Sequence, residues 1–173
     1  MYNYIHYIEI NDIISAWANY NLRRDKLDLN DWRKTMNIEF NVIATFDSKC
    51  KHILMCKRRK NPYKGLYNLV GGKIESGEDG LSSAYRELEE ETGISKNDII
   101  LTHLMDFTYY LPSIKLEVYV GRLNKEVSVH GDENDLEWVE INQNFFDISK
   151  YAGEGNIGHI MEHILLSKEI LLK

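Results

Sequence analysis

The sequence has few of the residues that build disulfide scaffolds and no segment that could span a membrane. It contains two cysteines, Cys50 and Cys56, and two prolines in 173 residues. Two cysteines are too few for a disulfide framework, and they lack the spacing of a metal-binding motif. No apolar run approaches the roughly 20 residues of a transmembrane helix, and the first residues lack the pattern of a secretory signal. We therefore expect a cytoplasmic protein without a membrane partner.

Composition and charge narrow the class further. With 43% hydrophobic and 28% charged residues the chain is typical of a soluble globular protein rather than a disordered one. The net charge of −6 argues against binding to polymeric nucleic acid. The length fits one domain, which we expect at residues 37–173. Residues 1–36, with a short helix at about 11–20, are expected to form an N-terminal extension packed on that domain.

The order of predicted elements favours an α+β fold with a mixed sheet. A hairpin, a short strand and a helix are followed by more strands and a terminal helix, so strands and helices do not alternate one for one. The expected strands are 38–46, 52–56, 66–70, 99–111 (broken near Asp106), 114–123 and 136–141, and the expected helices are 79–92 and 157–172.

Helix 79–92 has the clearest periodicity in the chain. Apolar residues and a threonine recur at helical spacing and predict the face that packs on the core. Gly93 stands where a left-handed C-terminal cap is expected. The predicted core face consists of Leu81, Ala84, Tyr85, Leu88 and Thr92.

Three glutamates of this helix lie at i, i+3 and i+4 spacing on a second face. They are Glu87, Glu90 and Glu91, whereas Glu89 falls on the other side of the apolar stripe. Like charges at this spacing destabilise a helix, and the last turns of a helix favour cations instead. We therefore infer a bound counter-ion, and clustered carboxylates are hard ligands that suit Mg²⁺ or Mn²⁺. Arg86 could pair with one of the carboxylates and orient it.

A basic segment precedes this acidic helix. No Asp or Glu occurs from Ser48 to Ile74, where there are eight lysines and arginines. Gly71 and Gly72 allow close approach of the backbone between strand and helix, and Lys73 follows them. Strand alternation directs Lys57 or Arg58, together with Lys73, towards the same site. A metal-binding carboxylate face beside cationic side chains is suited to a polyphosphate substrate.

These residues match a family signature in full. The Nudix box reads G-x5-E-x7-R-E-U-x-E-E-x-G-U, where U is aliphatic, and here it runs from Gly72 through Glu78 to Ile94. Nine constrained positions within 23 residues make the pattern specific. The chain therefore resembles the Nudix hydrolases, and the resemblance implies an α/β/α sandwich. Many members have a proline before the two glycines, where this chain has Leu69 and Val70; that proline is not a ligand.

The resemblance also implies roles for individual residues. Glu87, Glu90 and Glu91 would bind the metal, and one of them or a nearby loop glutamate would deprotonate the attacking water. Arg86 would orient a glutamate, and Glu78 would hold the loop or a second metal. Family members often add an acidic residue before a tryptophan-containing strand. Glu133 is our choice for it, with Asp132, Asp135 and Glu137 as competitors before Trp138.

The sequence leaves the substrate open. A MutT-like enzyme would hydrolyse nucleoside triphosphates, oxidised ones included, to monophosphate and pyrophosphate. Alternatives are ADP-ribose, nucleotide sugars or dinucleoside polyphosphates, and a non-catalytic nucleotide-binding module. Tyr110 lies where dinucleoside-polyphosphate enzymes have a tyrosine, either in the sheet or stacked on a base, and Pro112 lies near the proline of ADP-ribose enzymes. The dense basic segment favours triphosphates. A homodimer is compatible with all of these readings.

Overall fold

The computed structural model describes residues 38–109, 114–131 and 133–172. The predicted N-terminal extension, Tyr110, Pro112 and Asp132 lie outside the described residues.

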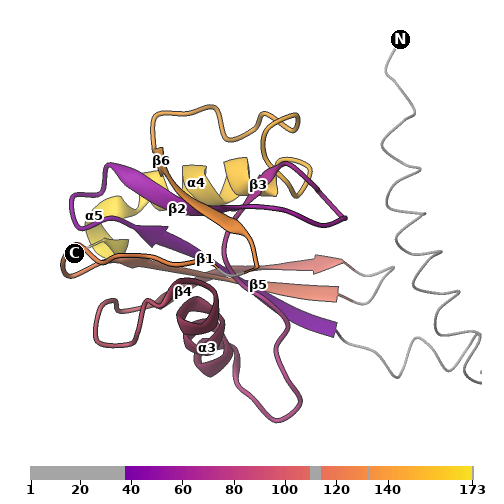
Figure 1. Cartoon of the computed structure of the whole chain (residues 1–173), viewed down its shortest axis with the longest axis horizontal. Helices are drawn as coiled ribbons and strands as arrows, with labels where there is room; N and C mark the ends of the chain where they lie inside the picture. Colours follow the sequence, from indigo (N-terminus) through magenta and orange to yellow (C-terminus); the bar gives the residue numbers. More distant parts are fainter. Residues whose placement is uncertain (1–37, 110–113, 132, 173) are drawn as a thin grey trace, which may run out of the picture.

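The described chain forms a six-stranded sheet and three helices (Figure 1). The fold is the α+β arrangement with a mixed sheet that the sequence predicts. The strands are β1 (Ile38–Phe46), β2 (His52–Lys57), β3 (Tyr67–Asn68), β4 (Thr102–Tyr109), β5 (Ile114–Arg122) and β6 (Asp135–Glu140). The helices are α3 (Gly80–Thr92), α4 (Asn156–Leu166) and α5 (Lys168–Leu171).

The sheet is mixed because β1 and β5 run parallel along their whole length, whereas the other pairs are antiparallel. Strand β2 meets β1 only where Phe46 pairs with Ile53. It then pairs with β6 on one side and with β3 on the other. As a result β2 diverges from β1, and the segment that leads into the box helix bridges to β1 instead, at Val70 with Ile43 and at Lys73 with Phe40.

Two hydrophobic cores lie on opposite faces of the sheet. Successive side chains of a strand point to opposite faces; thus Ile53 and Met55 of β2 enter one core, and Leu54 and Cys56 enter the other. Helix α4 covers the first face and α3 covers the second (Figure 1). This confirms the predicted α/β/α sandwich.

Helix α3 begins one residue after the predicted start, and Gly93 confirms the predicted C-terminal cap. Asp79 caps the helix by accepting a hydrogen bond from the amide of Ser82 at 3.0 Å. Gly93 adopts φ 77°, the left-handed conformation that favours glycine, and its amide donates to the carbonyl of Glu89. The cap positions thus fix the length of the helix that carries the box.

Four predictions about the elements need correction. Leu81 is 40% exposed, whereas Ser83 is buried, because α3 is rolled so that its Ser83 side faces β1. Strand β3 has two residues because the chain leaves β2 for the bridges to β1. The terminal helix is interrupted at Ser167, where φ −116° and ψ 13° are not helical. Strand β4 has its irregularity between His103 and Met105, not at Asp106.

None of the described helices is long and apolar enough to cross a bilayer.

Candidate active site

Gly71 and Gly72, which precede α3, lie in close contact with β1 and with the acidic face of the helix. A side chain at Gly71, which has φ 147°, would come within 2.3 Å of the Asn41 carbonyl oxygen. A side chain at Gly72 would come within 2.3 Å of a carboxylate oxygen of Glu87. Only glycine therefore lets the backbone lie this close to Glu87.

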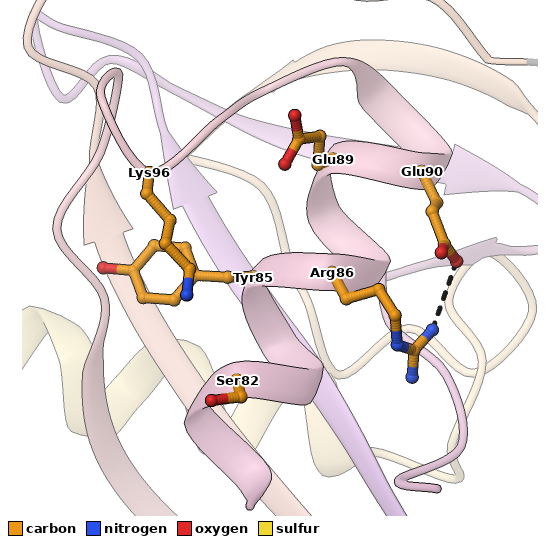
Figure 2. A pocket seen from close by; sticks show the side chains of 6 residues that line it. All are labelled: Ser82, Tyr85, Arg86, Glu89, Glu90 and Lys96. Atoms are coloured by element: carbon orange, nitrogen blue, oxygen red, sulfur yellow. Dashed lines mark hydrogen bonds and ion pairs between the residues drawn. The ribbon is translucent and has the colours of Figure 1, made fainter. Parts of the chain in front are cut away.

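Arg86 is the centre of the carboxylate face. Its guanidinium donates two hydrogen bonds to Glu78, at 3.1 and 2.9 Å, and one to Glu87 at 2.7 Å. A further bond of 3.1 Å reaches Glu90, which Figure 2 shows as a dashed line. The hydrogen bonds to Glu78 and Glu87 raise the pKa of Arg86, and those from Arg86 lower the pKa of Glu78. Arg86 thus holds three box carboxylates in fixed directions, as both the residues and the resemblance suggested.

Glu91 lies on the inner side of this face. It accepts a hydrogen bond of 3.5 Å from the Gly71 amide. Burial raises the pKa of Glu91 to about 7, and the negative charges of Glu87 and Glu133 contribute in the same direction. Arg58 has the opposite effect on this pKa. Four charged groups from three parts of the chain therefore act on one another at this point: the box helix, the end of β2 and the loop before β6.

The donor set suits a hard divalent cation. Glu87 and Glu91 are half-buried, whereas Glu90 keeps 61% of its side-chain surface exposed. In the described part of the chain Glu91 forms no ion pair within 4 Å, and Arg58 is the positive charge that acts on this half-buried carboxylate. Within that same part, no three acidic, histidine or cysteine side chains already converge as a metal cluster. The Arg86 guanidinium lies between the oxygens of Glu87 and Glu90 instead.

Arg58 and Lys73, the two predicted substrate contacts, differ in their surroundings. The Nε atom of Arg58 is buried and has no hydrogen-bond partner among the described residues. Lys73 has an exposed side chain, and its carbonyl accepts a hydrogen bond from Arg86 at 3.2 Å. The neighbouring Lys57, the alternative to Arg58, lies over the ring of Tyr67 on the other face of β2. Of these two residues, Arg58, which directly follows β2, is therefore the one that acts on Glu91.

The loop before β6 separates the candidates for the late acidic residue. Asp135 forms an ion pair with Arg59, and Glu137 accepts a hydrogen bond from the Tyr67 hydroxyl. Glu133 is exposed and acts electrostatically on Glu91. Of these three residues, Glu133 is the one that acts on Glu91, and its role as the late acidic residue stays a prediction.

Glu90 and Arg86 also border an open hollow of about 380 Å³ on the outer side of α3. Figure 2 shows its lining, in which the Lys96 ammonium lies 4.9 Å from the centre of the Tyr85 ring. The other two lining residues are Ser82 and Glu89. Glu90 is therefore reachable from solvent on a side where Glu91 is not exposed.

Sequence reasoning missed Asn41 and Ser83. Both are buried, and the Asn41 amide donates to the Ser83 hydroxyl at 2.9 Å across the boundary between β1 and α3. A polar residue amid the apolar positions of strand 38–46 was the available signal. It did not identify the partner, which lies 42 residues away.

Comparison with known proteins identifies the family. The NUDIX domain family matches residues 37–159, which is most of the chain. The chain belongs to this family. It is 28% identical to the Nudix hydrolase YvcI of Bacillus subtilis over 127 residues, covering 65% of this chain and 72% of that protein.

Other relatives match over shorter stretches or in fold alone. An ADP-ribose pyrophosphatase of Methanocaldococcus jannaschii is 38% identical over 69 residues, 40% of either protein's length. A solved MutT from work on Aliivibrio salmonicida and Vibrio cholerae superposes with a TM-score of 0.57 at 24% identity, covering 75% of this chain and 98% of that one. A bifunctional NMN adenylyltransferase/ADP ribose pyrophosphatase from Francisella tularensis gives 0.64 at 19% identity, covering 90% and 46%.

Proposed function

We propose that the chain is a magnesium-dependent pyrophosphohydrolase of nucleoside-diphosphate-containing substrates, with nucleoside triphosphates as its preferred substrates. The products would be the nucleoside monophosphate and pyrophosphate. The observation that carries the proposal is the site at Glu91, where half-buried carboxylates and Arg58 act on one another, and the buried Nε of Arg58 has no hydrogen-bond partner among the described residues. Such a site can take both a divalent cation and the phosphate oxygens that the cation leaves uncovered.

In this mechanism Glu87, Glu90 and Glu91 would hold Mg²⁺, or Mn²⁺ in its place. The cation would supply neutralisation of the diphosphate and acidification of water. Arg86 keeps Glu87 and Glu90 directed to one side of α3. Arg58 and Lys73 bind phosphate oxygens, and Gly71 and Gly72 let the backbone approach them. One of the box glutamates or Glu133 would accept the proton of the water that attacks phosphorus, as the P–O bond to the leaving group, pyrophosphate or the nucleoside monophosphate, breaks.

The preference for triphosphates follows from charge. A triphosphate carries more negative charge than a diphosphate bridge already neutralised by magnesium, and each charge-assisted hydrogen bond contributes about 1.5–3 kcal/mol. The test is the ranking of kcat/KM for dGTP, 8-oxo-dGTP, ADP-ribose and diadenosine polyphosphates. Arg58→Gln should lower kcat/KM for the triphosphate about tenfold or more, and more than it lowers that for ADP-ribose. A tenfold lead for ADP-ribose in the wild type would contradict the proposal.

ADP-ribose is the second candidate because of one comparison. The archaeal relative that is 38% identical over 69 residues is named an ADP-ribose pyrophosphatase. The same ranking of substrates decides between the two candidates.

Glu133 can be tested against a matched neighbour. We expect Glu133→Gln to lower kcat by roughly tenfold, since it would remove a charge near the bound cation. Asp135→Asn, which breaks an exposed ion pair with Arg59, should leave kcat close to the wild-type value. The reverse order would assign the late acidic position to Asp135.

A further inference from the structure

A buried polar link joins the central strand to the box helix. Asn41 of β1 is 1% exposed and points to the α3 side of the sheet, as Ile43 does two residues later. Its amide nitrogen donates to the Ser83 hydroxyl at 2.9 Å, and its amide oxygen accepts from the Gly72 amide at 3.4 Å. An asparagine at such a position is costly unless its polar atoms are paired. Here they are paired with the two segments that form the candidate active site.

The hydroxyl of Ser83 accepts two hydrogen bonds. A serine hydroxyl offers one donor and two acceptor positions. It accepts from Asn41 and, at 3.2 Å, from the Nη2 atom of Arg86. Both acceptor positions are therefore occupied, and the hydroxyl holds Arg86 from the inner side of the helix.

We infer that Asn41 and Ser83 are positioning residues that set the direction of the Arg86 guanidinium, and through it the carboxylates of Glu87 and Glu90. The inference rests on the proposed function, because it assigns these residues to the cation-holding face. Neither residue would touch the substrate; both act through Arg86 and through the Gly72 loop.

The geometry explains why a neutral anchor is needed. Apart from Ser83 and the Lys73 carbonyl, every partner of Arg86 is one of the carboxylates that it orients. If Glu87 and Glu90 turned towards a bound divalent cation, their ion pairs with Arg86 would weaken. The Ser83 hydroxyl, which is held from the strand, is a neutral partner like the Lys73 carbonyl and would keep Arg86 in place in both states. An apolar pair at 41 and 83 would pack as well but could not do this.

The test compares Ser83→Ala, Asn41→Leu and the double variant with Thr45→Val. Thr45 is a fitting control because it is also a buried polar residue of β1, but its hydroxyl has no partner among the described residues. We expect Ser83→Ala and Asn41→Leu each to weaken Mn²⁺ binding three- to tenfold, measured by electron paramagnetic resonance, and to lower kcat about tenfold with little change in KM. The double variant should be no worse than the more severe single one, since the residues act as one unit. Thr45→Val should match the wild type in both.

Ser83→Ala keeps the inference falsifiable if Asn41→Leu does not fold, since alanine is a good helix former. A lower melting temperature with Mn²⁺ affinity and kcat equal to those of Thr45→Val would make the pair structural only and overturn the inference. If the wild type itself bound no Mn²⁺ and cleaved no nucleotide, the proposed function would fail. In that case the exchange rate of the Arg86 Nε proton, measured by NMR, tests the positioning role of Ser83 independently of activity. It should be at least tenfold faster in Ser83→Ala than in Thr45→Val, and an equal rate would overturn the inference.

Discussion

The two faces of the sheet are covered by helices of opposite character. Under α4 the contacts are apolar, from Ile157, Ile160, Met161 and Ile164 against Phe46 and its neighbours. Under α3 the core includes a buried hydrogen-bonded pair and ends at half-buried carboxylates. The same sheet therefore supports one helix by burial alone and the other partly by polar contacts. We therefore expect substitutions on the α4 side to lower mainly the stability of the protein. On the α3 side the half-buried carboxylates should lower the stability of the metal-free protein but serve the proposed reaction.

The largest effect is expected on the α4 face. Ile160→Ala removes a side chain that is 1% exposed, and such truncations cost about 2–5 kcal/mol. Because Ile160 is far from the carboxylates in the packing, kcat of the folded protein should not change. Chemical denaturation and steady-state kinetics on the same preparation provide the measurement. A loss of kcat without a loss of stability would contradict the division between the two faces.

The converse is expected at Glu90. Glu90→Gln keeps the shape of an exposed side chain and removes a charge from the face that we propose to hold the cation, so kcat should fall roughly 10²-fold or more, about 2.7 kcal/mol. The melting temperature should remain close to the wild-type value, because Glu90 is 61% exposed. Glu89→Gln, one position along the same helix, is the matched control and should change little. Equal damage from the two variants would mean that the acidic face is wrongly assigned.

The charge of Glu91 should lower the free energy of unfolding of the metal-free protein. Burial raises its pKa to about 7 from a usual value of 4.5, so its ionised form is less favourable in the folded protein than in the unfolded chain. Without metal, the wild type should therefore lose stability as the pH rises from about 4.5 to 7. Glu91→Gln should be more stable than the wild type by about 1–2 kcal/mol at pH 8, and the difference should vanish near pH 4.5. Unfolding in EDTA across this range is the measurement, with Glu89→Gln as control. If Glu91→Gln were less stable than the wild type at pH 8, the ionised Glu91 carboxylate would not destabilise the folded protein.

Local and long-range features of the site differed in how far the sequence predicted them. Asp79 and Gly93 were predictable as the ends of α3, and Glu87, Glu90 and Glu91 as one face, since helix geometry relates residues a few positions apart. The pairing of Asn41 with Ser83 was not, because it depends on how β1 and α3 meet in space. The resemblance, not periodicity, pointed to Glu133. Whether Tyr110 takes part stays a prediction.

The roll of α3 is the clearest case of a fact that a helical wheel cannot supply. Periodicity separates apolar from polar positions, but the sheet decides which edge of the apolar stripe is covered. Here the Asn41–Ser83 bond turns the carboxylate side of the helix inwards, and Leu81 on the opposite edge is left 40% exposed. The predicted core position at 81 was wrong for this reason.

The smallest effect is therefore expected at Leu81. Leu81→Ala should lower the free energy of unfolding by less than about 1 kcal/mol, because the side chain already contacts solvent and alanine favours the helix. Leu88→Ala in the same helix removes a fully buried side chain and should cost about 2–5 kcal/mol. Denaturation curves of the two variants, with unchanged slopes, give the comparison. Equal losses would mean that Leu81 is covered in solution and that α3 is rolled back towards the orientation that periodicity alone predicts.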